Sequence, residues 1–147
     1  MEIIHKQFSE LTVYELFEIY KLRVSVFVVE QSCPYQEVDD DDKISCHVIM
    51  REGEKIKAYL RLIPDKSEKD VIHIGRVIAA ERRHGLGTAI VREGIRLAKE
   101  EYSAAILKLE AQVYAAGLYE KLGFKKCSDE FELDGIPHVE MIMNIRQ

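Results

Sequence analysis

The sequence lacks the features that mark secreted, membrane-spanning and nucleic-acid-binding proteins. It has three cysteines, an odd number without C-x-x-C spacing, which argues against a disulfide framework and a cysteine-based zinc site. Its first ten residues are polar, and no apolar run approaches the roughly 18 residues of a membrane span. The net charge of −5 argues against a nucleic-acid partner, because such binding relies on Lys and Arg neutralising phosphates. We expect a cytoplasmic protein.

Repeats, linkers and low-complexity tracts are also missing, so the chain is expected to form one domain, residues 1–147. A chain of this length buries roughly 68 to 70% of its unfolded surface, which suffices without a disulfide or a metal. The histidines show no spacing typical of a metal site: His5, His47, His73 and His84. We expect no bound metal.

Hydrophobic periodicity and capping signals predict alternating strands and helices. Thr12 and Glu15 form a capping-box pair, which predicts a helix from Thr12 to about Leu22. The buried face expected for this helix is Val13, Leu16, Phe17 and Tyr20. Residues 24–29 are rich in β-branched side chains and would form a strand on propensity alone. Further strands are expected at 45–51, 55–63, 71–80, 104–111, 126–133 and 138–145, with helices from about 86 to 98 and from 114 to 122. This order suits an α/β fold with a mixed sheet covered by helices on both faces.

A basic turn containing glycine joins the strand that ends at Ala80 to the helix that follows Thr88. We call residues 82–87 the glycine turn; they are Arg82, Arg83, His84, Gly85, Leu86 and Gly87. Backbone N–H groups at a helix start have no intrahelical partner and suit a phosphate, and the glycines let the backbone approach a diphosphate closely. The glycine turn therefore predicts a ligand that carries a pyrophosphate.

The spacing within the glycine turn narrows the choice of ligand. A P-loop needs G-x-x-x-x-G-K-[ST], and the turn contains no Lys-Ser or Lys-Thr pair. A dinucleotide fingerprint needs Gly or Ala where Ile90 stands. What does match is the Q/R-x-x-G-x-G/A motif of the GNAT acetyltransferases, through Arg82, Gly85 and Gly87. A helix start on a solvated surface is the alternative that this short motif leaves open.

Two further segments resemble the same family. The segment from Gln112 to Phe124, which contains LYEKLGF, resembles the GNAT pattern in which a polar residue ends one strand and the next helix carries a tyrosine that faces the cofactor sulfur; Tyr119 matches that tyrosine. Gln112 stands where Asn is commonest, and keeps an amide. LRVSVFVVEQSCPYQEVD at 22–39 and DGIPH at 134–138 resemble the ElaA-like branch. The matching stretches extend from about residue 16 to 143.

This resemblance implies the GNAT fold, a second short helix at residues 24–29, and acetyl-CoA as the acyl donor. The residues that it places at the donor are Val77, Ile78, Arg82, Arg83, His84, Gly85, Leu86, Gly87, Thr88 and Gln112. The implied reaction is transfer of the acetyl group to a primary amine, on a small molecule or a protein, by direct attack in a ternary complex. A catalytically silent acyl-CoA-binding module and a protein-interaction domain are the alternatives. No feature of the sequence identifies the acceptor or the oligomeric state.

Transfer to an amine needs two groups that handle protons, because an exposed amine is mostly ammonium at neutral pH and the departing thiolate takes up a proton. Tyr119 is the candidate acid, although a helical Tyr more often only packs its ring. Many GNAT proteins carry a carboxylate base on the strand before the turn, whereas residues 73–76 contain none. His138 is the first substitute because imidazole titrates near neutrality. Glu37, Glu110 and a water chain are the alternatives.

Residues 37–42, the acidic segment, fail the EF-hand pattern because no Gly stands at the sixth loop position. Taken alone, the segment is expected to be a solvated loop. Within the GNAT resemblance it lies on the acceptor side, where carboxylates attract a cationic amine. The residues expected to contact the acceptor are Tyr35, Gln36, Glu37 and Asp39.

Overall fold

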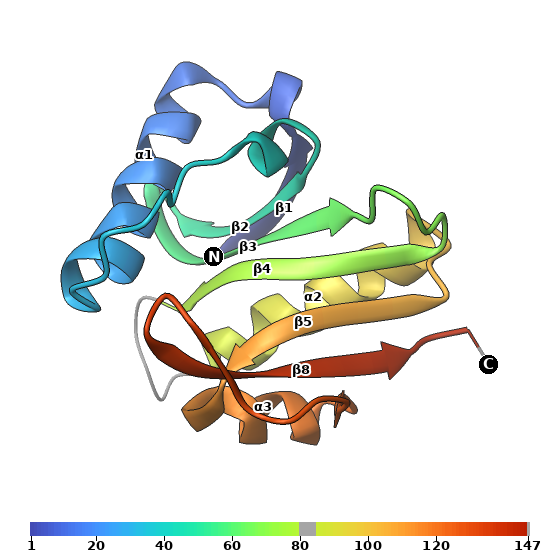
Figure 1. Ribbon diagram of the computed structural model, residues 1–147. Coiled ribbons are helices and arrows are strands. Elements are labelled where there is room, and N and C mark those ends of the chain that lie inside the picture. Colours follow the sequence, from blue (N-terminus) through green and yellow to red (C-terminus); the bar gives the residue numbers. More distant parts are fainter. Residues whose placement is uncertain (80–84, 147) are drawn as a thin grey trace.

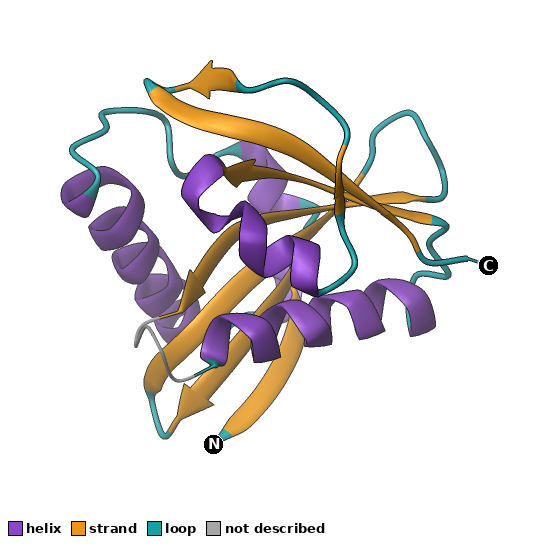
Figure 2. Cartoon of the chain, turned by 90° about the horizontal axis from the view of Figure 1, so that it is seen from below, coloured by secondary structure: helices purple, strands orange, loops and turns teal. Residues whose placement is uncertain are grey.

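The computed structural model describes residues 1–79 and 85–146, and they form a mixed sheet with helices on both faces (Figures 1 and 2). The strands are β1 (Glu2–Gln7), β2 (Cys46–Glu52), β3 (Lys55–Pro64), β4 (Val71–Ala79), β5 (Ile106–Gln112), β6 (Lys125–Lys126), β7 (Phe131–Leu133) and β8 (Ile136–Asn144). The helices are α1 (Val13–Arg23), α2 (Leu86–Glu100) and α3 (Ala116–Lys121). A π-helical segment (Val24–Glu30) continues α1, and short 3-10 turns span Phe8–Glu10, Asp40–Lys43 and Val113–Ala115. The expected fold class is confirmed.

The strands of the described residues follow the order β1-β2-β3-β4-β5-β8-β6, with β7 paired to β8. Neighbours are antiparallel except β4 and β5, which are parallel and connected through α2. Their register covers only Val71–Ile74 against Ile106–Leu109. Beyond this short seam β4 continues to Ala79 and β5 to Gln112 without pairing to each other. The centre of the sheet therefore opens where the two parallel strands part.

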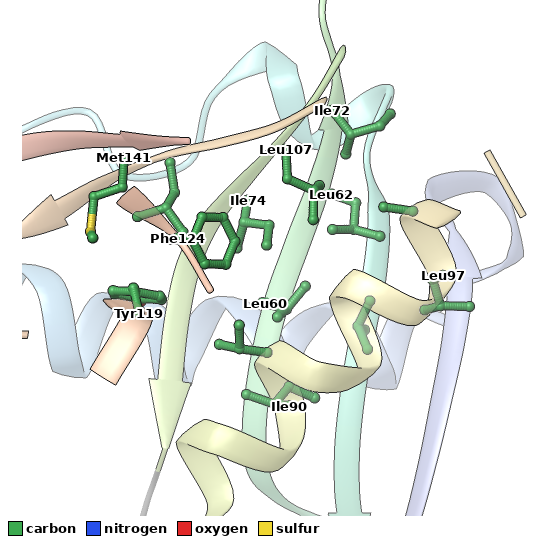
Figure 3. Close-up of a cluster of buried hydrophobic side chains, with 14 of the residues drawn as sticks. Leu60, Leu62, Ile72, Ile74, Ile90, Leu97, Leu107, Tyr119, Phe124 and Met141 are labelled. Atoms are coloured by element: carbon green, nitrogen blue, oxygen red, sulfur yellow. The ribbon is translucent and has the colours of Figure 1, made fainter. Parts of the chain in front are cut away.

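Alternation along β2 and β3 divides the core between the two faces of the sheet. Leu60 and Leu62 pack with α2 in the main core, shown in Figure 3. Tyr59 faces the other way and packs with Ile49 and with Ile19 of α1. In α2, a Cβ at Gly94 would lie 3.1 Å from Leu60 Cδ2, so the missing side chain lets the helix approach the sheet closely. Both faces are thus covered by apolar contacts.

The capping box at the start of α1 is confirmed, but its predicted buried face is wrong in part. Thr12 Oγ1 accepts from Glu15 N at 3.1 Å, and Thr12 N donates to Glu15 Oε1 at 2.9 Å. Val13 and Phe17 are 80% and 62% exposed, however. The residues of α1 that are buried are Ile19 and Arg23. The helix is rotated so that this i, i+4 pair faces the sheet, because a buried arginine with ion partners occupies a position that an apolar pattern overlooks.

Two other differences from the sequence patterns concern the N-terminal half. Residues 24–30 are helical, so the fold overrides the β-branched composition, but they continue α1 as a π-helical segment instead of forming the separate second helix that the family resemblance implied. Strand β1 was not predicted. It is an edge strand with a polar, largely exposed composition, so it shows little of the alternation by which strands are identified. No helix in residues 1–79 or 85–146 has the length and apolarity needed to cross a membrane.

Candidate active site

A cavity of about 1150 Å³ opens where β4 and β5 part. One wall is residues 75–79 of β4, and another is residues 110–112 at the end of β5. Leu22, Val26 and Phe27, from the end of α1 and the π-helical segment, form an apolar wall. The cavity thus has one side between the parting strands and another under the N-terminal helices. Sequence patterns did not predict this apolar wall. The feature that could have indicated it is the run of apolar residues at 22–29.

Strand β4 is bent by a β-bulge at Arg76. Gly75 pairs with Arg61 and Ile78 with Tyr59, so one more residue is accommodated on β4 than on β3 between these pairs. Arg76 has φ +54°, in the left-handed region that non-glycine residues rarely adopt. Bulges redirect a strand and are frequent beside active sites. This one lies at the point where β4 leaves β5, and the β4 backbone beyond it faces the cavity.

The described part of the glycine turn begins α2. Gly85 is the N-cap residue and has φ +71°, a conformation that favours glycine. The hydrogen bond from Ala89 N to Gly85 O, 3.0 Å long, closes the first turn of the helix. The N–H groups of Leu86, Gly87 and Thr88 precede it and therefore have no intrahelical acceptor. Gly87 lines the cavity, whereas Leu86 packs on the core. The predicted basic residues of the turn, Arg82, Arg83 and His84, lie outside the described residues.

Tyr119 reaches the cavity from α3 and is buried, with 7% of its surface exposed. Its ring packs edge-on against Phe124, with centroids 6.0 Å apart (Figure 3). Burial, with a smaller contribution from Tyr114, raises the pKa of Tyr119 to about 12. The phenol therefore keeps its proton at neutral pH, which is the state required of a proton donor.

Comparison with known proteins identifies the family to which this chain belongs. Residues 12–145 match a family model described as an acetyltransferase (GNAT) domain. The chain belongs to the GNAT acetyltransferase family. It is 43% identical over 149 aligned residues to a UPF0039 protein of Schizosaccharomyces pombe, covering 99% of this chain and 98% of that one. It is 32% identical to protein ElaA of Escherichia coli, covering 95% and 94%.

Solved structures agree with this assignment. The crystal structure of Escherichia coli ElaA matches this GNAT protein with a TM-score of 0.91 at 31% identity, over 97% of this chain and 99% of that one. An acyl-CoA N-acyltransferase from Pseudomonas aeruginosa matches with a TM-score of 0.90 at 32% identity, over 97% and 99%. The resemblance to the ElaA-like branch is confirmed, and the protein is an acyltransferase.

Two residues of the acidic segment of this GNAT protein are buried, in contrast to the solvated loop expected from its composition. Arg23 is fully buried and bonds Asp42 through Nη1–Oδ1 at 2.6 Å and Nη2–Oδ2 at 3.1 Å. Its Nε donates to Glu37 Oε2 at 3.0 Å. Burial by itself would raise the pKa of Asp42, but the hydrogen bonds and charges of Arg23 and Arg61 hold it below its ordinary value. The solvated-loop prediction is therefore wrong for Glu37 and Asp42, because arginines from α1 and β3 draw them inward.

The same ion-pair cluster, formed by Arg23, Arg61, Arg76, Glu37, Asp39 and Asp42, extends to the bulge on β4. Arg76 pairs with Glu37 and Asp39, and its guanidinium lies over the Tyr35 ring, 5.5 Å from the centroid. Arg61 Nη1 donates to Asp39 Oδ1 at 2.7 Å. Two of the carboxylates predicted to attract an acceptor, those of Glu37 and Asp39, are thus already paired with arginines.

The other two residues expected on the acceptor side, Tyr35 and Gln36, lie in different surroundings. Tyr35 lines the cavity, and burial, acting against the nearby Arg76, raises its pKa to about 12. Gln36 is exposed, and its Nε2 donates to Val38 O at 2.9 Å within the loop. The side chain of Gln36 therefore turns to its own backbone, whereas that of Tyr35 borders the cavity.

Residues near the ends of β5 and β8 border the cavity from the other side. His138 lies opposite Gln112 in the register, and both line the cavity with Glu110. The Nδ1 of His138 lies 2.7 Å from Ile136 O, and because a carbonyl only accepts, this nitrogen carries the proton. The ring stacks on Phe131 and is 8% exposed. His138 can thus present an unprotonated Nε2, and its role as base stays a prediction.

The cavity also contains a pair that the sequence patterns missed. His73 on β4 and Asp65 in the β3–β4 connection both line it, with His73 Nε2 and Asp65 Oδ1 2.7 Å apart. Their spacing in the sequence carries no motif, so only the folded hairpin shows the contact. In the described ranges, no set of three or more His, Cys, Asp or Glu side chains is placed to hold a metal ion.

Proposed function

We propose that this GNAT protein transfers the acetyl group of acetyl-CoA to a primary amine, on a small molecule or a protein, by direct attack in a ternary complex. One observation carries the proposal. The parting strands, the N-terminal end of α2 and the protonated Tyr119 all border one cavity. A thioester held there would meet a backbone that can bind it and an acid that can protonate its leaving group.

The donor side of the cavity suits an extended ligand that ends in a pyrophosphate. Amides along the pantetheine arm of acetyl-CoA can pair with the β4 backbone at Val77 and Ile78, as an added strand would. The free N–H groups at the start of α2 suit the phosphates, since a helix N-terminus favours negative charge. The basic residues before Gly85 would add charge at that end, as predicted from the sequence.

The reaction follows from placing donor and acceptor in the same cavity. The neutral amine attacks the thioester carbon, the C–N bond forms, and the C–S bond breaks. Tyr119, whose buried phenol is protonated, donates a proton to the departing thiolate, and the proton that the attacking nitrogen loses on forming the amide restores the phenol. Because the donor side and the apolar wall of Leu22, Val26 and Phe27 border one space, both substrates can be present together.

Calorimetric titration with acetyl-CoA and CoA, followed by free-thiol detection across a panel of amines, tests the proposed function. We expect one binding site for each nucleotide and thiol release matched by acetylated amine. Acetyl-CoA binding without transfer to any amine would contradict the proposed acceptor class. Absence of binding by either nucleotide would contradict the donor site itself.

Two glycine variants separate donor binding from folding. A Cβ at Gly87 would make ordinary contacts, 3.7 Å from Leu118 Cδ2 and 3.8 Å from Ala79 Cβ, so the fold accepts a side chain there. We expect Gly87→Val to weaken acetyl-CoA binding about tenfold or more, because its branches enter the cavity beside the helix start. The melting temperature should change little.

The control for this prediction is Gly53→Ala, in the turn between β2 and β3. No heavy atom lies within 4 Å of a Cβ at Gly53, but the left-handed backbone, with φ +61°, costs a side chain about 1 kcal/mol or more. We expect this variant to lose stability in urea unfolding and to keep most of its acetyl-CoA affinity. An unchanged affinity in folded Gly87→Val would remove the start of α2 from the donor site.

A further inference from the structure

His73 and Asp65 form a hydrogen-bonded pair whose protons can be assigned. Asp65 Oδ1 lies 2.7 Å from His73 Nε2, and Oδ2 accepts from Ser67 N at 3.0 Å, Ser67 Oγ at 3.1 Å and Glu68 N at 2.8 Å. The N–H of Glu68, then the His73 ring and Ser67, hold the pKa of Asp65 well below its usual range. Because a carboxylate only accepts, His73 Nε2 carries the proton and Nδ1 has a lone pair when the ring is neutral.

The position of the pair suits a group that serves the reaction. Ile72 and Ile74 lie in the main core, so His73 between them points to the opposite face of the sheet, where it lines the cavity together with Arg61 and Ile63 of β3. The seam between β4 and β5 ends at Ile74, directly after His73. The His73 side chain is 36% exposed, which allows water or a substrate amine to reach the ring. The pair thus lies where the strands begin to part and is open to solvent.

Charged groups surround His73 from each neighbouring element. Lys108 on β5 lies opposite it in the register. Besides Asp65, the charged side chains that line the same cavity are Glu30, Asp41, Arg61, Lys66, Arg76, Glu110 and Asp134. Arg61 is paired with Asp39 and Asp42, and Lys66 with Asp41. Among the described residues, the carboxylate bonded to the His73 ring is that of Asp65.

The two histidines of the cavity differ in what supports their charged form. His138 donates through Nδ1 to a neutral backbone carbonyl, is 8% exposed and stacks on Phe131. His73 donates to an ionised carboxylate and is more exposed. The carboxylate of Asp65 fixes the orientation of the His73 ring through a hydrogen bond, and the ring remains open to the cavity. His73 is therefore the histidine of the cavity that is both oriented by a carboxylate and accessible to a substrate amine.

From this geometry we infer that His73, oriented by Asp65, is the general base that deprotonates the acceptor ammonium. The inference rests on the proposed function. His73 Nδ1 takes one proton from the ammonium, directly or through one water, and later releases it to solvent. The neutral amine then attacks the thioester carbon, and the C–S bond breaks. The second proton lost by the nitrogen replaces the one that Tyr119 gives to the thiolate, so the products are the amide, CoA thiol and one released proton.

A pair of acceptors distinguishes a base from a residue that merely shapes the cavity. An aliphatic amine is an ammonium ion at pH 7 and needs a base, whereas an arylamine is already neutral and does not. We expect His73→Gln to lower kcat/KM for the aliphatic amine about 100-fold or more and to leave the arylamine nearly unaffected. The lost rate should return at high pH, where the aliphatic amine deprotonates in solution. Asp65→Asn should show the same selectivity with a loss of about tenfold or more.

The matched control is His5→Gln, the same substitution on an exposed residue of β1, and it should leave both reactions unchanged. Ring nitrogen NMR spectra give a readout independent of transfer. Neutral His73 should carry its proton on Nε2 in the parent and lose this preference in Asp65→Asn. Equal losses with both amines in His73→Gln, or no loss with either, would overturn the inference. Loss of the aliphatic reaction in His138→Gln alone would assign the base to His138. Failure of the parent to acetylate any amine would contradict the proposed function itself.

Discussion

Tyr119→Phe is expected to bind acetyl-CoA as the parent does and to turn over about 10²- to 10⁴-fold more slowly. The substitution removes the hydroxyl and keeps the ring, so the edge-on contact with Phe124 remains. Burial holds the Tyr119 pKa near 12, and the group that is lost is therefore a proton donor rather than a phenolate. Calorimetric affinity for acetyl-CoA and steady-state kcat with one amine measure the two effects separately.

Tyr14→Phe supplies the control for this comparison. Tyr14 lies on α1 and is 84% exposed, so removing its hydroxyl should change neither affinity nor kcat. Full kcat in Tyr119→Phe would show either that the thiolate leaves without this acid or that another step limits turnover. Single-turnover measurement of thiol release separates these two cases. A fall in acetyl-CoA affinity equal to the fall in kcat/KM would instead make Tyr119 a donor-binding residue.

Arg23→Met should destabilise the protein by about 3 to 5 kcal/mol, because it leaves buried carboxylates without their cation. Glu37 and Asp42, its partners, are 3% and 1% exposed. Arg23→Lys keeps the charge but loses the two-pronged bond to Asp42, and an intermediate loss is expected. Urea unfolding monitored by far-ultraviolet circular dichroism measures the free energy of unfolding of the parent, Arg23→Met and Arg23→Lys.

The matched control is Arg51→Met at the edge of the sheet. Arg51 also pairs with two carboxylates, those of Glu2 and Glu15, but its side chain is 28% exposed. Exposed ion pairs contribute about 1 kcal/mol or less, so this variant should lose little stability. Equal losses in Arg23→Met and Arg51→Met would mean that burial of the cluster has no special cost. A stable Arg23→Met would show that the carboxylates take up protons or water when the arginine is removed.

Local signals in the sequence predicted the elements whose cause is local. The capping box of Thr12 and Glu15 fixes the start of α1, and Gly85 marks the start of α2 because a left-handed N-cap there needs no side chain. The lining of the cavity by Tyr119 follows from a motif within a single helix. These features depend on residues that are close in the chain, so a pattern of spacing can identify them.

Sequence patterns did not predict the features that depend on contacts between distant segments of the chain. No sequence pattern singles out Arg23, because its partners Glu37 and Asp42 meet it only when the acidic segment folds over α1 and β3. The bulge at Arg76 leaves no mark in composition, since arginine rarely adopts a positive φ. His73 and Asp65 meet because the β3–β4 connection turns back on the strand. Much of the candidate site is thus made by contacts between segments.

The short seam between β4 and β5 has a mechanical consequence for the whole molecule. Among the described residues, the pairing of Val71–Ile74 with Ile106–Leu109 is what joins the antiparallel group β1 to β4 with the antiparallel group β5 to β8 within the sheet. The pairs β2–β3, β3–β4 and β5–β8 are bonded along longer registers, so bending of the sheet costs least at the seam. Helix α2 packs mainly on β2, β3 and β4, on one side of the seam. We expect the two halves of the sheet to tilt about these few hydrogen bonds when a substrate too wide for the cavity enters.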